Sequence, residues 1–364
     1  MRVPFLNLDR EADILIGLGL MKDIEDVIRS GHFLFGPKAT ELEIRLSEMF
    51  NRPVVLVGSG TDALALSLKA LGIGYGDRVA IPAFSAIPTA VAVKMIGAIP
   101  VYVDVDFGMT MCTNASTLKN LDVKAFIPVH LYGNPADIET IKYHCVKRGI
   151  SLVEDCAQSF GATFDENLLG TFGMSGALSF YPTKNLGCMG DGGAVIACDE
   201  QMAKAIRELR FYGQETRNRM GRMIGMNSRM DEIQCAILIK KLQLFPAQAK
   251  RRIQMLEQYR EALLKTPFRM VAWRKGALPH LFPIMSNNRD RVVAMLAKRE
   301  VETSKHYPFH LMETVEGRPG AGLFSNAKEF SETVISLPFN PWMTDDEIDH
   351  VLKSVMEVGE CESL

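Results

Sequence analysis

From residue 54 to residue 198, short apolar runs alternate with stretches whose apolar residues recur at helical spacing. The runs rich in branched and aromatic residues predict strands: PVVLVGSG, RVAIP, PVYVDVD, KAFIPV, SLVED, ALSFY and GGAVIAC. The stretch TDALALSLKALG and the segments near residues 89–97 and 137–148 predict helices. Strands that alternate with helices in this way are typical of an α/β fold with a mostly parallel sheet, covered by helices on both faces.

The pattern changes in the last third of the chain. Residues 231–264 predict one long helix, with apolar side chains at Ile233, Ile237, Leu238, Leu242 and Leu244. After Pro267 the pattern weakens into a smaller α+β segment that ends in a helix over residues 344–358. We therefore expect a large domain over residues 1–246 and a small domain over residues 247–364, with the N-terminal segment packed on the small one.

Composition narrows the class of protein further. The chain has 364 residues, 47% hydrophobic and 23% charged, which suits a globular protein with ample core. A net charge of −2 gives no indication of a nucleic-acid or membrane-surface partner. The start of the chain has no apolar signal region, and the longest weakly charged stretch, residues 79–103, contains prolines and Lys94. Neither the seven cysteines, which include no CxxC pair, nor the seven histidines show metal-ligand spacing, so we predict no metal site and a reduced, cytoplasmic protein.

A single lysine stands out in the segment SFYPTKNLGCMGDGG. Lys184 follows a β-prone run and Pro182, and four glycines come soon after it. Glycines are used where the backbone turns sharply or approaches a ligand. Lys184 could be a reactive amine at a strand exit or a solvated loop residue, and this stretch alone does not decide between them.

Two other strand ends carry polar groups. The segment Gly58-Ser59-Gly60-Thr61 lies between a strand and a helix start, where free backbone N–H groups favour a phosphate, although such residues also serve as simple helix caps. Asp155 ends the strand SLVED, with Gln158 three residues on. A buried carboxylate needs a cationic partner or several donors, and the alternative is again a helix cap.

Together the three sites match the needs of pyridoxal phosphate, because ligands of parallel α/β sheets lie at the carboxyl ends of strands. The Lys184 amine would form the Schiff base with the cofactor, and the helix start after Gly58 would bind its phosphate. Asp155 would keep the pyridine nitrogen protonated, so that the ring can accept electrons from a carbanion.

Motifs along nearly the whole chain then become recognisable, in this order: VPFL, FLFGPKATELE, GSGTDALALSLKALGIGYGDRVAIPAFS, PVHLYGNPADI, VEDCAQSFGATF, SFYPTKNLGCMGDGGAV, MNSRMDEIQCAIL, HYPFHL and VISLPFNPWMT. With these motifs the sequence resembles the sugar-nucleotide aminotransferases of the DegT/DnrJ/EryC1/StrS family. The resemblance implies the type I fold of pyridoxal-phosphate enzymes, related to aspartate aminotransferase.

The resemblance also implies roles for individual residues. It makes Lys184 the Schiff-base lysine, Asp155 the partner of the pyridine nitrogen and Gln158 a neighbour of the ring hydroxyl. Phosphate contacts would come from the backbone of Gly60 and Thr61, the Ser179 hydroxyl and, from the partner subunit, Asn227. Tyr181, His306 and Tyr307 would lie near the sugar nucleotide. Ala86 occupies the position at which the family usually has an aromatic residue stacked on the cofactor ring, so that either Phe84 or an aliphatic neighbour such as Ile87 covers that face, or the cofactor is held less tightly.

The same motifs contain residues for which we predict supporting roles. His130 of PVHLYG would support the site structurally, and Arg229 and Asp231 would steady the NSRMDE turn through ion pairs.

The function implied is transfer of an amino group from L-glutamate to a keto-deoxysugar linked to dTDP or UDP, at C3 or C4, by a homodimer with shared active sites. Such reactions make unusual amino sugars, including those of lipopolysaccharide O-antigens. Two alternatives remain. A sugar-nucleotide dehydratase of this fold typically has histidine at the lysine position, so Lys184 favours transamination. A non-catalytic regulatory member would be favoured if Lys184, Asp155 or the phosphate-binding turn were missing.

Overall fold

The computed structural model describes residues 1–111, 113, 118, 121–216, 218–221, 223–317 and 324–362. Its main sheet has seven strands in the order β1-β9-β8-β5-β4-β2-β3. These are β1 (Val54–Val57), β2 (Arg78–Pro82), β3 (Ile99–Val103), β4 (Ala125–Phe126), β5 (Ser151–Asp155), β8 (Ser175–Ser179) and β9 (Gly193–Ala197). Only β9 runs antiparallel to its neighbours β1 and β8, so the sheet is mostly parallel, as predicted.

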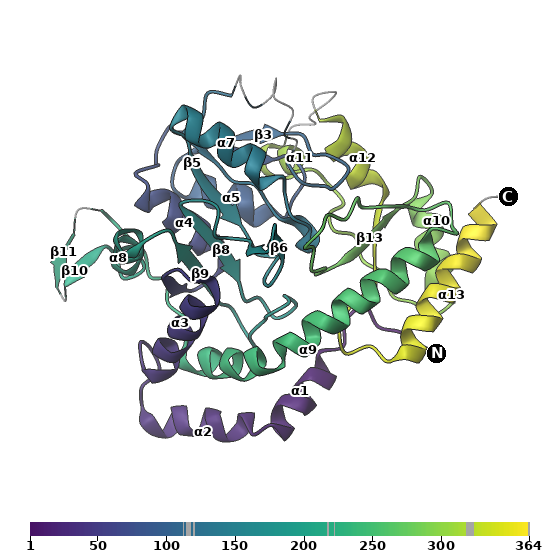
Figure 1. The fold of residues 1–364 in the computed structure, drawn as a ribbon, viewed down its shortest axis with the longest axis horizontal. Coiled ribbons are helices and arrows are strands. Elements are labelled where there is room, and N and C mark those ends of the chain that lie inside the picture. Colours follow the sequence, from purple (N-terminus) through teal and green to yellow (C-terminus); the bar gives the residue numbers. More distant parts are fainter. Residues whose placement is uncertain are drawn as a thin grey trace.

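Helices cover both faces of this sheet because its strands are apolar on both sides (Figure 1). In β1, Val55 and Val57 belong to one core together with the apolar faces of α4 (Gly60–Ala70), α5 (Ile87–Met95) and α8 (Glu200–Leu209). The alternate residues Val54 and Leu56 pack in a second core against α3 (Pro37–Phe50) and α9 (Glu232–Leu263). This alternation follows from the period of two along a strand. A third core lies between the sheet and α7 (Ile138–Arg148).

A smaller antiparallel sheet forms in the C-terminal part. It consists of β12 (Arg269–Met270), β13 (Phe282–Met285) and β14 (Val334–Leu337). The helices α10 (Arg289–Lys298) and α13 (Asp345–Glu362) pack beside it, and α11 (Leu311–Glu316) and α12 (Ser325–Thr333) precede β14. Val3 lies in this core and forms a parallel bridge with Val301, so the N-terminus is anchored here, ahead of α1 (Leu8–Gly17) and α2 (Leu20–Ser30).

The long helix α9 connects the two parts of the molecule (Figure 1). It continues through Pro246, at which we placed the domain boundary. Before this proline, Leu238 and Phe245 belong to the core of the large sheet; after it, Met255 and Tyr259 belong to the core of the small one. The division of the chain into domains at residue 246 thus stays a prediction, and the structure places that residue inside a helix that both cores share.

Four short strands lie outside both sheets. The hairpin of β10 (Gln214–Thr216) and β11 (Arg219–Met220) projects from the body beyond α8, at the left of Figure 1, and β6 (Thr163–Phe164) pairs with β7 (Asn167–Leu168). Among the described residues, the structure contains no helix with the length and apolar content needed to cross a membrane.

Candidate active site

A cavity of about 300 Å³ opens at the carboxyl ends of the parallel strands. Its walls come from the residues that follow β1, β2, β5 and β8, which is where ligands of parallel α/β sheets bind. Eight of the predicted site residues line it: Gly60, Thr61, Ala86, Asp155, Gln158, Ser179, Tyr181 and Lys184. The fold thus brings together groups that lie more than 120 residues apart in the chain.

The first wall is the N-terminus of α4. The Ser59 side chain caps this helix by accepting a hydrogen bond from the Asp62 N–H (3.1 Å). The two N–H groups between them, of Gly60 and Thr61, have no acceptor among the described residues. A Cβ atom on Gly60 would lie 2.8 Å from the Ser179 Cβ, so only glycine allows the end of β8 to approach so closely. Two free N–H groups at a helix start, beside a serine hydroxyl, form a site for a phosphate or another anion.

Asp155 ends β5 and is 4% exposed. Its carboxylate accepts hydrogen bonds from the Thr89 hydroxyl (2.8 Å) and the Ala157 N–H (3.1 Å). Burial raises the pKa of Asp155 above its usual value, and these two donors, with the charge of Lys184, only partly oppose the rise. The carboxylate therefore lines the cavity with a charge that a cation there would stabilise. Sequence reasoning missed Thr89, because it lies 66 residues before Asp155 and has the appearance of an ordinary helix-start threonine.

Lys184 lies in a tight turn directly after β8. Its N–H donates to the Tyr181 carbonyl (2.9 Å), and the Cys188 N–H donates to the Phe180 carbonyl (2.7 Å). A Cβ on Gly187 would lie 2.5 Å from the Pro182 carbonyl oxygen, so this glycine allows the turn to close. Burial lowers the pKa of the Lys184 amine to about 8, against the opposing influence of Asp155. At neutral pH roughly a tenth of the amine is then unprotonated and nucleophilic.

Gln158 is held between two tyrosines. Its side-chain oxygen accepts the backbone N–H of Tyr132 (2.8 Å), and its Nε2 donates to the Tyr307 hydroxyl (2.8 Å). His306 stacks on Phe5 at 5.6 Å and pairs through Nδ1 with the Ser336 hydroxyl (2.9 Å). Neither His306 nor Tyr307 is among the lining residues of the cavity, and their contact with a sugar nucleotide stays a prediction.

On the wall formed by Ala86, the adjoining chain contributes Ser85, Pro88 and Thr89, and the aromatic ring among the described lining residues of the cavity is that of Tyr181, after β8. Phe84 is fully buried and packs edge-on against Tyr307 (6.3 Å) and Phe330 (6.1 Å), which places it in the core between the two parts of the chain. Ile87 is 45% exposed and also does not line the cavity. Neither candidate of the sequence therefore covers this wall within one protomer.

The segment with Asn227 lies beside the phosphate-binding turn without entering the cavity. Asn227 is exposed, and its neighbour Ser228 donates to Asp62 (2.7 Å) and accepts the Gly58 N–H (2.9 Å). No ion pair of Arg229 or Asp231 occurs in the described part of the chain. Instead, the Arg229 guanidinium lies 5.7 Å from the centre of the Phe211 ring.

Glu232, the first residue of α9, links this turn to α3 in place of these ion pairs. Its carboxylate accepts three N–H groups at the start of α3, from Gly36, Lys38 and Ala39.

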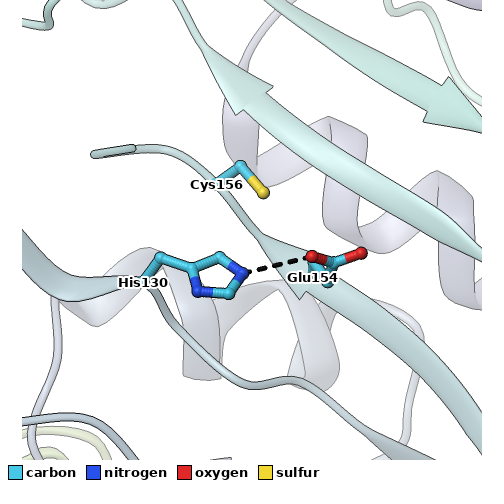
Figure 2. Close-up of side chains that lie close together, drawn as sticks. All are labelled: His130, Glu154 and Cys156. Atoms are coloured by element: carbon cyan, nitrogen blue, oxygen red, sulfur yellow. Dashed lines mark hydrogen bonds and ion pairs between the residues drawn. The ribbon is translucent and has the colours of Figure 1, made fainter. Parts of the chain in front are cut away.

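Behind the cavity, three ligand-type side chains meet: His130, Glu154 and Cys156 have atoms within 4.8 Å of one another (Figure 2). His130 Nδ1 accepts the Ala136 N–H (3.0 Å), so its proton is on Nε2, which donates to Glu154 (3.2 Å). The Glu154 carboxylate also accepts the N–H groups of Gly170, Phe172 and Gly173.

These hydrogen bonds occupy the atoms that a metal ion would need. Burial and the neighbouring negative charges raise the pKa of Cys156 well above its usual value, so it stays a thiol. We interpret the cluster as a structural support of β5, the role predicted for His130.

The lining residues fit pyridoxal phosphate. The orphaned amides of Gly60 and Thr61, with Ser179, suit a phosphate; the Asp155 carboxylate suits a protonated ring nitrogen; and Lys184 supplies the amine. The volume of the cavity is at the lower end of the range usual for ligand sites, about 300–1,000 Å³.

Comparison with known proteins agrees with this geometry. A sequence model of the DegT/DnrJ/EryC1/StrS aminotransferase family matches residues 17–356. Three relatives are similar over most of the chain. The erythromycin biosynthesis sensory transduction protein EryC1 of Saccharopolyspora erythraea is 36% identical, covering 98% of this chain and 99% of the relative. A UDP-2-acetamido-2-deoxy-3-oxo-D-glucuronate aminotransferase of Pseudomonas aeruginosa is 36% identical, with 88% and 90% covered. A dTDP-3-amino-3,4,6-trideoxy-alpha-D-glucose transaminase of Streptomyces venezuelae is 34% identical, with 99% and 97% covered.

Solved structures show the same fold. DesV of Streptomyces venezuelae, in complex with a ketimine intermediate, superposes with a TM-score of 0.94 at 34% identity, covering 99% of each chain. NtdA of Bacillus subtilis, with the bound cofactor PMP, gives a TM-score of 0.90 at 28% identity, covering 99% of this chain and 85% of the other.

Proposed function

The chain belongs to the DegT/DnrJ/EryC1/StrS aminotransferase family, and on this premise we propose that it transfers the amino group of L-glutamate to C3 of a keto-deoxysugar linked to dTDP or UDP, for amino-sugar biosynthesis. The chain is a pyridoxal-phosphate-dependent aminotransferase of fold type I. The names of the Pseudomonas and Streptomyces relatives, which refer to position 3 of a UDP-linked and a dTDP-linked sugar, support the choice of carbon and nucleotide.

One observation carries the proposal: Lys184, with a lowered pKa, lines the same cavity as Asp155 and the free amides of Gly60 and Thr61. When bound, pyridoxal phosphate supplies an electron sink that makes the α-proton of an amino acid acidic. The Gly60 and Thr61 amides would bind the phosphate, with the Ser179 hydroxyl. Asp155 would hold a proton on the ring nitrogen. The Lys184 amine would take the proton from the α-carbon of the donor, because burial keeps a fraction of it neutral at working pH.

The regulatory alternative has some support in the name of the Saccharopolyspora relative, a sensory transduction protein. A purely regulatory chain has no need of a lysine with a lowered pKa beside a buried aspartate and a phosphate-binding turn, and all three are present here. Lys184 likewise favours transamination over dehydration, for which histidine is typical at this position. Catalysis is therefore the better supported function.

The test is a panel of dTDP-, UDP- and GDP-linked 3-keto and 4-keto sugars, each incubated with glutamate carrying an isotopically labelled nitrogen. Transfer of the label to a dTDP- or UDP-linked 3-keto sugar, detected by mass spectrometry, is the expected result. The Lys184→Ala variant is the control, because it keeps the cavity but lacks the amine. Exclusive labelling of 4-keto sugars would refute the C3 assignment, and no labelling of any sugar would refute the function.

We further propose a cytoplasmic homodimer in which Asn227 completes the partner's phosphate site. The exposed position of Asn227 and the exposed apolar residues Phe33, Phe35 and Tyr212 support this. The described cysteines are free thiols, which suits a reducing compartment, and Cys112 lies outside the described residues.

Complementation tests the shared site. Lys184→Ala and Asn227→Ala chains are unfolded together and refolded. If sites are shared across the interface, one site of each heterodimer carries both lesions and the other carries none, so activity returns in part. Heterodimers that form without any recovered activity would show that Asn227 serves its own subunit.

A further inference from the structure

The Gln158 amide is fixed by a backbone group and a phenol at its two ends. Its Oε1 accepts the Tyr132 N–H, and its Nε2 donates to the Tyr307 hydroxyl, both at 2.8 Å. A backbone N–H can only donate, so the amide oxygen must face Tyr132 and the NH₂ group must face Tyr307. The orientation of this amide therefore follows from the chemistry of its neighbours.

In this orientation, one N–H of Gln158 has no acceptor among the residues that the structure describes. An amide NH₂ has two donors, and Tyr307 accepts only one of them. Gln158 is 4% exposed and lines the cavity, so a group bound there is within reach of the second donor. Gln158 thus offers the ligand a hydrogen-bond donor and not an acceptor.

Tyr307 belongs to a closed chain of contacts that joins the two parts of the molecule. The Tyr132 hydroxyl donates to the backbone carbonyl of His306, next to Tyr307, and the His280 N–H donates to the Tyr132 carbonyl (2.7 Å). The Tyr307 ring also packs against Phe84. Burial raises the pKa of Tyr307, so its hydroxyl stays protonated and neutral. The segment 306–307 is therefore held against Gln158 from several sides.

We propose that Tyr307 is a positioning residue: it holds Gln158 so that the free N–H of this amide donates to the ring oxygen of bound pyridoxal phosphate. The inference rests on the proposed function for the identity of the ligand, and on the two hydrogen bonds of Gln158 for the geometry. It gives Tyr307 a role toward the cofactor in place of the predicted contact with the sugar.

The consequence is a lower proton affinity of the linkage between Lys184 and the cofactor. When that linkage loses its proton, the ring oxygen remains as an anion without a neighbouring positive charge. A donor at this oxygen therefore favours the proton-free form. The visible absorption of the holoenzyme changes with this protonation, so its pH midpoint reports on the Gln158 donor independently of turnover.

The test is a spectrophotometric pH titration of the holoenzyme. Tyr307→Phe is expected to raise the midpoint by about 0.5–1 pH unit, the effect of weakening one hydrogen bond. Tyr132→Phe keeps the backbone N–H but loses the hydrogen bond to His306, so it should raise the midpoint by less. This variant also tests the proposal if Tyr307→Phe does not fold. Tyr102→Phe is the matched control, because Tyr102 donates to Glu316 (3.2 Å) away from the cavity, and its midpoint should match the wild type.

A double variant decides whether Tyr307 acts through Gln158. In a Gln158→Leu background, Tyr307→Phe should cause no further shift. An unchanged midpoint in both tyrosine variants, or a full shift that persists without Gln158, would overturn the proposal. A higher KM for the sugar with an unchanged midpoint would do the same, and would assign Tyr307 to the substrate. Failure of the proposed function gives a different result, which is no transfer of label to any sugar of the panel.

Discussion

Two neighbouring carboxylates at the end of β5 have opposite surroundings. Glu154 points to one face of the sheet and is fully buried; it accepts hydrogen bonds from three backbone N–H groups and from His130 (Figure 2). Asp155 points to the other face and lines the cavity, and its donors among the described residues are Thr89 and Ala157. The two residues share a strand, a charge and a degree of burial, so the difference lies in the number of donors around each.

This difference distinguishes a carboxylate that stabilises the fold from one that serves catalysis. A buried carboxylate with four donors is satisfied by the protein, so it stabilises the fold and has little left to offer a ligand. A buried carboxylate with two donors and a raised pKa gains stability from a cation in the cavity. We therefore expect loss of Asp155 to affect catalysis and loss of Glu154 to affect folding.

The largest expected effect is at Lys184, the amine on the Asp155 side of the sheet. Lys184→Ala should lower turnover by on the order of 10⁵ or more, because the nucleophile and proton carrier is lost, while circular dichroism stays that of the wild type. Borohydride reduction of the wild-type holoenzyme followed by peptide mapping should label Lys184. Lys241, which is buried and paired with Glu11 (2.6 Å), is the control lysine and should carry no label. Label on any lysine but Lys184 would contradict the assignment.

Asp155→Asn is expected to slow the half-reaction with glutamate by roughly 10²–10⁴-fold, the range of a group that controls a proton in the transition state. An amide cannot keep the ring nitrogen protonated, although cofactor should still bind. The same change should leave the melting temperature of the cofactor-free protein unchanged or higher, because it removes a carboxylate whose charge is costly to bury. Single-turnover rates within a few-fold of the wild type would contradict the catalytic role that distinguishes Asp155 from Glu154.

Glu154→Gln should lower stability and leave catalysis largely unchanged, the opposite of Asp155→Asn. Its NH₂ group would face backbone N–H donors that have no other acceptor, so the free energy of unfolding should fall by about 3 kcal/mol. The half-reaction rate of the folded enzyme should change by less than about tenfold. Urea unfolding and single-turnover kinetics measure the two quantities, and Glu200→Gln, at an exposed helix start, is the control. A stable but inactive Glu154→Gln would mean that both carboxylates serve the chemistry.

The smallest effect is a pH dependence of stability in the cofactor-free protein. Folding lowers the pKa of Lys184 from 10.5 to about 8, so the unfolded chain binds more protons between these values and stability rises with pH across this interval. Lys184→Met should remove this rise and increase the free energy of unfolding at pH 7 by about 1–2 kcal/mol. The increase is limited because Asp155 loses a stabilising positive charge. Urea unfolding at pH 7 and pH 9.5 measures it. Equal pH dependence in both proteins would show that folding does not lower the pKa of Lys184.

Much of the fold and of the cavity could be predicted from local patterns. The apolar runs and helical spacing depend on residues a few positions apart, and the predicted strands and helices are found, with shifts of a few residues, such as Ser175–Ser179 for the run ALSFY. The glycines after Lys184 indicated a sharp turn, and at Gly187 the backbone passes so close to Pro182 that a side chain would clash. Eight of the eleven site residues line one cavity because strand ends of a parallel sheet converge.

The positions of Phe84, Arg229 and Tyr307 could not be predicted in the same way. Motif position made Phe84 one of the candidates to cover the ring face, yet its ring packs against Phe330 in the core between the two parts of the chain. Arg229 lies over the Phe211 ring where an ion pair was expected. Tyr307 contacts Gln158, which is 149 residues away in the chain. Each of these contacts depends on how two distant segments pack.

The sequence by itself determined the α/β alternation, the three strand-end groups and the cofactor that they suit, because these follow from residue type and short spacing. Only the tertiary structure decided that Glu154 is satisfied and Asp155 is not. The donors to Glu154 come from His130 and from Gly170, Phe172 and Gly173, whereas a donor to Asp155 comes from Thr89. A strand pattern specifies which face a side chain points to, but the number of donors on that face depends on segments that only folding brings there.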